Sequence, residues 1–504
     1  MSLRHLFACA ALLISMSASA ARLVPDVQHL DALPMHALPS LAVEKAVKET
    51  QAKGSPLQFA VSMPLTLGLA DGVWQPVDGQ TLAWRTRIYS AGAQTLNFHF
   101  SQFHLPAGAE LWLYDPSGKR LAGPYTRANE LGDGQLWTAV IDGDTAVLEA
   151  RVPATAKDQL QLQLKEANHG YRGFGKAATG SFNTSGACEI DVACPAGQPY
   201  LDQARALARI TIGGNTLCSG QLVNNVRQDS TPFFLTANHC GISSGNASSV
   251  VFYWNYQNSN CGGNGSEPGY QTQSGSLYVA GDVSSDFTLV KAAQALDPAF
   301  NLYLAGWNAS SSVPQSGGVV HHPQGDVTKV ATYTAPASRN DNVSLCDGSF
   351  SLGGICLGTT RQIKAWQVTY AQGITEPGSS GSALLDQNRL IVGQLSGGSS
   401  ACSGSSGSSG NGQSDVYGRT ELAWTANAAA SGQLKANLDP DNTGTLQLGG
   451  KNANSGTIAP SSSGNGAGSG SGGGGAMPLL TLGSLLFVAL RRKKPRTGAA
   501  ASPG

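Results

Sequence analysis

The sequence predicts an all-β protein. Glycine is abundant, with 63 of 504 residues, while charged residues make up only 13% of the chain. So few charges disfavour long helices with salt-bridged faces, and short strands joined by turns suit this composition better. Apolar and polar residues alternate along 82–89 and 96–100, as expected for strands whose side chains point to opposite faces in turn.

Residues 1–20 have the pattern of a secretory signal peptide. Arg4 and His5 precede an apolar run at 6–14, and Ala18-Ser19-Ala20 offers the small residues that signal peptidase requires. A membrane anchor is the alternative, but the run is too short to span a bilayer. We therefore expect cleavage after Ala20 and export of the chain.

Cysteine usage supports an exported protein. Cys9 lies in the signal peptide and the other eight lie between residues 188 and 402. An even set in an exported chain indicates four disulfide bonds, although spacing alone leaves their pairing open. The eight are Cys188, Cys194, Cys218, Cys240, Cys261, Cys346, Cys356 and Cys402.

The composition argues against two classes of function. The 32 basic residues are balanced by 32 acidic ones, whereas nucleic-acid binding needs a clear basic excess. A zinc site needs paired C-x-x-C motifs or histidines at ligand spacing, and neither arrangement is found in the sequence. We expect no nucleic-acid partner, no metal and no cofactor.

The composition also divides the chain into segments. Residues 21–176 lack cysteine and contain the alternating stretches, so we expect a β-rich domain there, and residues 177–450 hold all eight paired cysteines. Ser and Gly dominate 451–475, which is typical of a linker. Residues 476–490 form an apolar run, short for a bilayer span, before a basic tail at 491–504. An unstructured tail is the alternative.

The sequence Gly-Ser-Ser-Gly-Ser at 378–382 is a candidate nucleophile turn around Ser380. A serine hydroxyl attacks well only when a base takes its proton and backbone N–H groups face the developing oxyanion. Glycines permit a tight turn in which the N–H groups of Gly378 and Ser380 converge on one point. Because Gly/Ser runs are common in this chain, a plain turn is the alternative.

Two further motifs supply a base and a carboxylate. His239 follows an apolar stretch and precedes a cysteine, and Asp286 opens the apolar stretch 287–290. Taken singly, the histidine can be structural and the aspartate can cap a strand; Asp282 is a second acid nearby. The chain order His239, Asp286, Ser380 is that of the triad in chymotrypsin-type proteases, and other protease folds use other orders.

From Cys188 to about Gly449 the chain resembles the bacterial lysyl endopeptidases, trypsin-like serine proteases of the Achromobacter protease I type. The resemblance covers slightly more than half of the chain and its motifs are specific. The matching stretches are 190–195, 222–225, 234–241, 253–259, 285–289, 298–302, 321–323, 375–382 and 414–419.

This resemblance implies a fold and an activity. Residues 177–450 are expected to form two six-stranded antiparallel β-barrels of the chymotrypsin-like type, preceded by a β-rich propeptide at 21–176. The implied activity is hydrolysis of peptide bonds on the carboxyl side of lysine, in a secreted zymogen activated by propeptide removal. Arg or dual Lys/Arg specificity is an alternative, and a catalytically silent surface-binding homologue is another.

It also implies roles for individual residues. His239, Asp286 and Ser380 would form the catalytic triad, with the N–H groups of Gly378 and Ser380 as the oxyanion hole. Asp415 would lie at the base of the substrate pocket, where a buried carboxylate favours a cationic side chain. The implied disulfides join Cys188 with Cys402, Cys194 with Cys261, and Cys218 with Cys240. Cys346 and Cys356 lie outside that pattern, and as the remaining pair we join them.

The sequence departs from the family pattern at two positions. Ser396 stands where the family has a histidine, and the family's tryptophan matches Trp366 only across a two-residue insertion before Thr375. Trp366 is therefore our candidate for an aromatic substrate-binding residue, and the family's pH optimum and rate do not carry over. His321 and His322 match the family, and we expect them to be structural.

The C-terminal tail resembles a GlyGly-CTERM sorting signal, in which a Ser/Gly linker, an apolar block and a basic end follow one another. Such tails imply a rhomboid-type sorting protease and the secretion machinery of a Gram-negative bacterium. We expect a secreted enzyme, associated with the cell surface through this tail, that acts on proteins or peptides and is a monomer when mature.

Lysine is unevenly distributed, which favours self-processing. Seven lysines lie between residues 21 and 176, but only four between 177 and 450. A lysine-specific enzyme would then cut its propeptide more readily than itself. We expect cleavage after Lys176, with Lys165 second.

Overall fold

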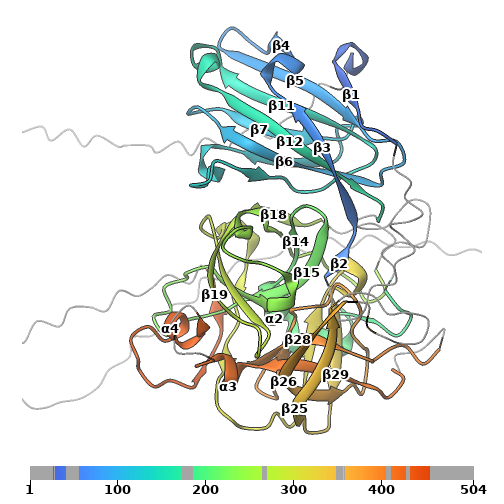
Figure 1. Cartoon of the computed structure of the whole chain (residues 1–504), viewed down its shortest axis with the longest axis vertical. Coiled ribbons are helices and arrows are strands. Elements are labelled where there is room, and N and C mark those ends of the chain that lie inside the picture. The colour runs from blue at the N-terminus through green and yellow to red at the C-terminus, as the bar shows by residue number, and fades with distance from the viewer. Residues whose placement is uncertain are drawn as a thin grey trace, which may run out of the picture. The chain divides into compact units, whose positions relative to one another are not determined.

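The computed structural model describes residues 27, 29–40, 56–172, 185–263, 269–347, 356, 358–404, 410–426, 429 and 432–453. Strands dominate these residues and the helices are short (Figure 1), so the predicted all-β class is confirmed. None of the helices in this part of the chain has the length and apolar character needed to cross a bilayer. The expected signal peptide, Lys176, the apolar segment 476–490 and the basic tail fall outside the described residues.

The N-terminal strands form two sheets around one core. One sheet has the order β1-β5-β11-β7-β8, with β4 beside β5, and the other has β10-β6-β12-β3, with β9 beside β6. Trp84 and Phe98 are buried in the core that both sheets share, so the sheets form a sandwich. The strands are β1 (Met35–Ala37), β3 (Ala60–Leu67), β4 (Val73–Pro76), β5 (Thr81–Tyr89), β6 (Thr95–His104), β7 (Glu110–Tyr114), β8 (Leu121–Tyr125), β9 (Leu136–Trp137), β10 (Ile141–Asp142), β11 (Thr145–Pro153) and β12 (Gln161–Gly170).

A third sheet carries the segment that precedes His239. Its order is β18-β17-β14-β15-β16-β20-β19, and the short β2 (Leu57–Gln58) pairs with β15. The other strands are β14 (Leu207–Ile212), β15 (Thr216–Leu222), β16 (Phe233–Ala237), β17 (Val251–Trp254), β18 (Gln271–Ser274), β19 (Ser276–Asp282) and β20 (Phe287–Ala292).

A fourth sheet carries the segments around Ser380 and Asp415. Its order is β13-β24-β23-β27-β28-β29-β26-β25, with β22 beside β28 and β30 beside β22; β21 (Tyr303–Leu304) and β31 (Lys451–Asn452) pair separately. Its strands are β13 (Ile190–Asp191), β22 (Trp307–Asn308), β23 (Gly317–His321), β24 (Lys329–Tyr333), β25 (Ser338–Asp347), β26 (Thr359–Thr369), β27 (Ala383–Leu385), β28 (Ile391–Gly398), β29 (Ser414–Arg419) and β30 (Gln447–Leu448).

These two sheets differ in their number of strands from the two six-stranded barrels that we expected. They hold eight and ten strands. Short strands such as β2, β13, β22 and β30 extend them, and the long β25–β26 hairpin adds a further pair.

Helices are confined to short segments between strands. The α-helices are α2 (Leu201–Ala206), α3 (Thr420–Ala423) and α4 (Lys435–Leu438). The 3-10 helices are η1 (Leu30–Ala32), η2 (Leu69–Asp71), η3 (Arg127–Asn129), η4 (Ala154–Gln159), η5 (Pro195–Tyr200), η6 (Asn238–Cys240), η7 (Ala247–Ser249), η8 (Pro298–Phe300) and η9 (Pro323–Gly325).

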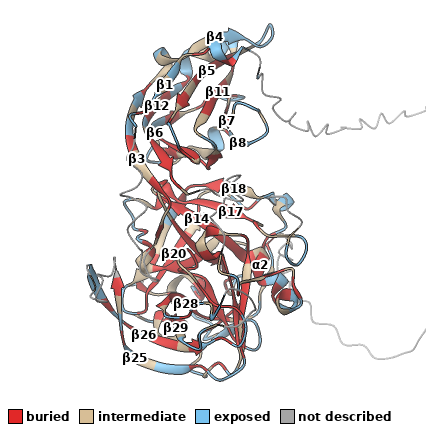
Figure 2. Cartoon of the chain, turned by 90° about the vertical axis from the view of Figure 1, so that its right-hand side faces the viewer, coloured by how far each residue is buried: buried red, intermediate tan, exposed pale blue. Residues whose placement is uncertain are grey.

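One hydrophobic core joins the third and fourth sheets. Leu289 of β20, Val320 of β23 and Leu385 of β27 are fully buried within it. Figure 2 shows buried residues along β14, β17 and β20. Because the two sheets share this core, loops from both can be held in fixed positions relative to one another.

Four disulfide bonds lie in this part of the chain, in the four pairings expected from the sequence. They join Cys188 with Cys402, Cys194 with Cys261, Cys218 with Cys240, and Cys346 with Cys356. The first spans 214 residues of sequence. A link over so long a segment restricts the unfolded chain strongly and so stabilises the fold.

An aromatic cluster around Phe234 of β16 provides a test of the core. Phe234 makes edge contacts with Phe252 and Trp254, at ring-centroid distances of 5.0 and 5.8 Å. We expect Phe234→Ala to lower the free energy of unfolding by about 3–5 kcal/mol, through lost burial and a residual cavity.

The measurement is urea unfolding of the full chain, monitored by near-UV circular dichroism. Both variants also carry Ser380→Ala, which prevents self-digestion. Leu277→Ala is the control, because that side chain is 49% exposed. A loss for Phe234→Ala no larger than for the control would contradict this account of the core.

Candidate active site

Ser380 lies in the turn between β26 and β27, and hydrogen bonds from both sheets hold that turn. The Ser219 N–H of β15 donates to the Ser380 carbonyl at 2.8 Å, and the Gly381 N–H donates to the Leu395 carbonyl of β28 at 2.9 Å. Gly378 and Gly381 have φ of 95° and 86°, a region that residues with a Cβ rarely adopt. The local sequence thus needs glycine on both sides of the serine pair.

The N–H groups of Gly378 and Ser380 have the environment of an oxyanion hole. Both residues are buried, and the Gly378 carbonyl accepts a hydrogen bond from Oγ of Ser219 at 2.8 Å. Within the described residues, neither N–H donates to a protein acceptor. Buried N–H groups without a partner are rare in folded proteins. These two are therefore suited to receive an acceptor from outside the chain.

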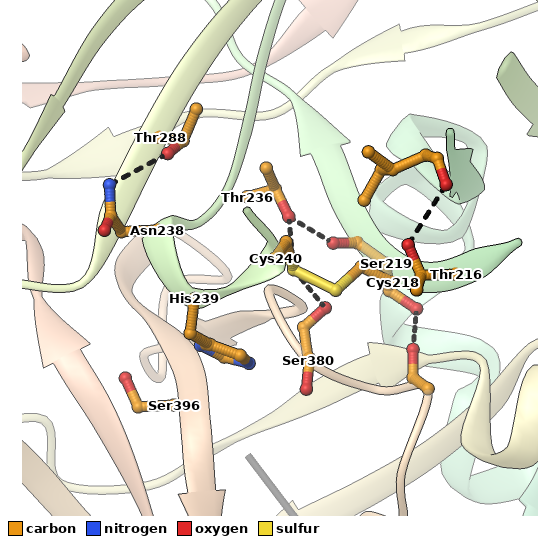
Figure 3. The surroundings of a disulfide bond; sticks show 12 residues. Thr216, Cys218, Ser219, Thr236, Asn238, His239, Cys240, Thr288, Ser380 and Ser396 are labelled. Carbon is orange, nitrogen blue, oxygen red and sulfur yellow. Dashed lines mark hydrogen bonds between the residues drawn. A yellow bond between two sulfur atoms is a disulfide. The ribbon is translucent and has the colours of Figure 1, made fainter. Parts of the chain in front are cut away.

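His239 lies in η6, directly after β16, and its ring contacts Asp286. Nδ1 lies 2.9 Å from Oδ2 of Asp286, and the His239 backbone N–H donates to Oδ1 at 2.9 Å. The disulfide between Cys218 and Cys240 ties η6 to β15, and Figure 3 shows the imidazole reaching toward Ser380. Because Nδ1–H donates to the carboxylate, Nε2 is the nitrogen that can accept a proton.

Asp286 is fully buried just before β20, with φ of 51°. Burial raises the pKa of its carboxyl, but the nearby charges of His239 and Arg361 and a hydrogen bond from Ser396 outweigh burial, so the pKa lies below its ordinary value. The carboxylate is therefore ionised at neutral pH. Its contribution to stability is present above the ordinary aspartate pKa and is lost as pH falls through the lowered value.

The sequence did not predict the contact between Arg361 of β26 and Asp286. Nη1 of Arg361 donates to Oδ2 of Asp286 at 2.7 Å, and the two side chains are 6% and 1% exposed. No local motif surrounds Arg361 in the sequence, and 75 residues separate the pair. The inward-facing alternation of Arg361, Ile363 and Ala365 was the available signal, but it does not identify the partner.

Asp415 of β29 is held by hydrogen bonds from neighbouring hydroxyls. Its side chain is fully buried, and Oδ2 accepts hydrogen bonds from Oγ1 of Thr375 at 2.6 Å and from Oγ of Ser400 at 2.7 Å. Oδ1 accepts the Ser400 N–H at 3.0 Å. Gly398 lies directly against this carboxylate, and a Cβ there would overlap it.

Two tyrosines complete the surroundings of Asp415. The hydroxyls of Tyr370 and Tyr417 are hydrogen-bonded to one another, and both rings are buried. Burial first, and with it the negative charge of Asp415, raises the pKa of both hydroxyls well above the ordinary value. Both phenols therefore stay neutral beside Asp415.

His321 and His322 lie beside the nucleophile turn and are buried. Nδ1 of His321 is 2.8 Å from Oγ of Ser379, and its Nε2 is 3.5 Å from Oε2 of the buried Glu189. Burial, with the charge of Arg209, lowers the pKa of His322 to about 3, so this ring is neutral. Across the described part of the chain, no three His, Cys, Asp or Glu side chains gather as a metal site would require.

Trp366, the expected aromatic partner of the substrate, lies in the core of the fourth sheet. It is 1% exposed, and its indole N–H donates to the Val392 carbonyl at 3.1 Å. The guanidinium groups of Arg339 and Arg419 lie 5.2 and 5.4 Å from its ring. Its role in substrate binding stays a prediction.

Comparison with known families gives two matches along the chain. Residues 182–418 match the family described as "Lysyl endopeptidase, C-terminal domain", and residues 29–171 match the "Lysyl endopeptidase N-terminal domain". A lysyl endopeptidase from Pseudomonas aeruginosa is 26% identical over 399 residues, covering 72% of this chain and 80% of that protein.

Two solved protease structures are also similar. The active form of the Rv3671c protease from M. tuberculosis is 16% identical and covers 49% of this chain and 92% of its own, with a TM-score of 0.28. The MamO protease domain from Magnetospirillum magneticum is 11% identical and covers 46% of this chain and all of its own, with a TM-score of 0.29.

The turn around Ser380 can be tested at Gly378. We expect Gly378→Ala to lower kcat about 100-fold or more, because loss of one oxyanion donor has that effect. A Cβ at Gly378 would lie 3.0 Å from backbone atoms and would displace the N–H. Gly444→Ala is the matched control: its φ of 78° imposes similar strain, but no atom lies within 4 Å of the added Cβ. Equal activity in the two folded variants would contradict the role of this turn.

Proposed function

Because the chain belongs to the lysyl endopeptidase family of serine endopeptidases, we propose that it hydrolyses peptide bonds on the carboxyl side of lysine, with His239, Asp286 and Ser380 as its catalytic triad. The observation that carries the proposal is the buried contact between His239 and Asp286 beside Ser380. Two sheets that share one core bring these residues together.

Catalysis begins with the hydroxyl of Ser380. Nε2 of His239 takes its proton while Oγ attacks the carbonyl carbon of the scissile bond. The imidazolium that forms is stabilised by Asp286, whose Oδ2 lies 2.9 Å from Nδ1. The same proton then passes to the leaving amine, and water hydrolyses the acyl-enzyme by the same route.

The oxyanion forms next to the two buried N–H groups. Those of Gly378 and Ser380 would donate to it, since neither has an acceptor within the described chain. Fixed donors of this kind need no rearrangement as charge develops, which is why they lower the barrier. Hydrogen bonds from Ser219 to the carbonyls of Gly378 and Ser380 hold in place the turn that carries these N–H groups.

Asp415 supplies the selectivity for a cationic side chain. A buried carboxylate strongly favours a cationic side chain that desolvates against it. Lysine suits this site better than arginine. Both oxygens already accept hydrogen bonds from Thr375 and Ser400, so a compact ammonium can bind between them. The planar guanidinium needs two oxygens free along one edge.

Two other functions remain as outcomes of experiment. An Arg-specific or Lys/Arg-specific protease would use the same triad and the same acid, and digestion of a denatured protein mixture with mass-spectrometric reading of every cut separates these specificities. A catalytically silent binding protein would not react with a fluorophosphonate probe. The contact between His239 and Asp286 and the glycine turn around Ser380 support the enzyme.

Activation would follow removal of residues 21–176. Leu57 and Gln58 of β2 pair with Leu217 and Thr216 of β15 in the precursor, and Leu217 shares a core with the N-terminal sandwich. The contrast in lysine content between the two regions supports cleavage by the enzyme itself. The initial cut would follow Lys176.

The enzyme would be exported by a Gram-negative bacterium. The signal peptide at 1–20 and four disulfide bonds support an oxidising location. We assign the segment 476–490 and the basic tail to a sorting signal, which engages the secretion machinery and a C-terminal sorting protease. The mature enzyme would act as a monomer on protein or peptide substrates.

Selectivity can be tested at Asp415. We expect Asp415→Asn to lower kcat/KM for lysyl substrates by two to three orders of magnitude, because removing one partner of a buried charge pair costs about 3–5 kcal/mol. Labelling of Ser380 by a small neutral fluorophosphonate should persist. Asp441→Asn is the control, since Asp441 pairs with Arg227 at the surface. Near-normal cleavage after lysine by Asp415→Asn would exclude Asp415 as the pocket acid.

Processing can be tested at the propeptide boundary. In the full chain, Lys176→Ala should slow maturation and move the cut to Lys165, while Ser380→Ala should leave the precursor intact. The mature N-terminus is read by mass spectrometry, with Lys119→Ala as the control. A mature N-terminus that follows a residue other than lysine would show that another protease performs this step.

A further inference from the structure

A buried guanidinium lies on the carboxylate that orients the catalytic histidine. Nη1 of Arg361 donates to Oδ2 of Asp286 at 2.7 Å, and Nη2 donates to the Ser396 carbonyl at 2.6 Å. The same Oδ2 lies 2.9 Å from Nδ1 of His239. One carboxylate oxygen is therefore shared between a fixed cation and the catalytic imidazole.

The β25–β26 hairpin positions this cation. Only the later part of β26, from Ala365 to Thr369, pairs with β29, and the earlier part pairs with β25 alone. The disulfide between Cys346 and Cys356 ties the end of β25 to the residues before β26. The Lys364 N–H donates to the Ser284 carbonyl at 3.3 Å, which attaches β26 to the loop that carries Asp286. Arg361 thus approaches Asp286 from a strand that is held on both sides.

We propose that Arg361 is a positioning residue for the triad, which fixes the Asp286 carboxylate and holds the pKa of His239 below that of a triad whose aspartate lacks a cation. The proposal rests on the triad proposed above. Its physical basis is that a neighbouring positive charge disfavours a second one. Arg361 offsets part of the attraction between Asp286 and the imidazolium, so His239 stays neutral, and active as a base, at lower pH.

Other charged groups on the surrounding elements have different partners. Asp282 accepts hydrogen bonds from Ser285 at 2.8 Å, Arg419 donates to Asp341 at 2.7 Å, and Lys364 is exposed. Asp415 is held by hydroxyls in the substrate pocket. The strand β28 has no charged residue. The groups in question are Asp282 on β19, Lys364 on β26, and Asp415 and Arg419 on β29.

The lowered pKa of Asp286 agrees with this arrangement. After burial, which acts in the opposite direction, the charges of His239 and Arg361 are its main causes. A purely structural role, in which Arg361 only compensates a buried charge, predicts the same contact. The pH dependence of catalysis separates the two roles, because the acidic limb of kcat/KM reports the base of the free enzyme.

The test is the pH profile of kcat/KM for a chromogenic lysyl amide. For the wild type we expect the acidic limb of this profile to have an apparent pKa below about 6.5, the ordinary value of histidine. Arg361→Gln should raise the apparent pKa of that limb by about 1 unit and lower kcat about 10-fold. Arg361→Lys keeps a positive charge, so its apparent pKa should stay near the wild-type value while kcat is reduced. Lys364→Gln, which removes an exposed charge from the same strand, should shift neither.

Each outcome has one meaning. An unchanged or lowered acidic limb in active Arg361→Gln would overturn the proposal, even if kcat falls. If Arg361→Gln does not fold, the wild type and Arg361→Lys decide the question. An apparent pKa of the wild-type acidic limb above about 7 would overturn the proposal. An apparent pKa below about 6.5 in the wild type, with a similar value in Arg361→Lys, would support it. A wild type that neither hydrolyses the amide nor reacts with a fluorophosphonate would instead contradict the proposed function.

Discussion

The buried charge of Asp286 is the constraint around which the candidate site is assembled. A carboxylate removed from water is costly unless hydrogen bonds and opposite charges replace its hydration. Here His239 comes from the loop after β16, Arg361 from β26 and Ser396 from β28. The third and fourth sheets must therefore be packed against one another before this charge is compensated. The geometry that stabilises Asp286 is the same geometry that aims the imidazole at Ser380.

Two buried acids lie in this site, and their surroundings differ in kind. Asp286 has a cationic partner within the chain, Arg361, so its charge is compensated before any substrate arrives. The hydrogen bonds of Asp415 come from Thr375 and Ser400, which are neutral. Hydroxyls satisfy lone pairs but do not cancel the charge. Under the proposed function, Asp286 would serve catalysis and Asp415 would favour a cationic side chain of the substrate.

Local motifs predicted the candidate triad residues because each has a recognisable setting: an apolar strand before His239, an apolar strand after Asp286, and glycines around Ser380. Asp415 has no such setting and was found through the family resemblance. Arg361 and Glu189 were missed, since their partners are fixed by strand register between distant segments. Short strands such as β2 and β13, which extend the two sheets, depend on pairing rather than on pattern. The tertiary position of Trp366, inside the core, likewise depends on packing.

The departure at Ser396 and the presence of Arg361 belong to one arrangement. The family has a histidine at the position of Ser396, whereas here a small side chain hydrogen-bonds Asp286 and its own carbonyl accepts the guanidinium. A histidine changes charge near neutral pH, but a guanidinium does not. A permanent cation next to Asp286 adds no titration of its own near neutral pH. Under the proposed mechanism, protonation of His239 would then set the acidic limb of the rate.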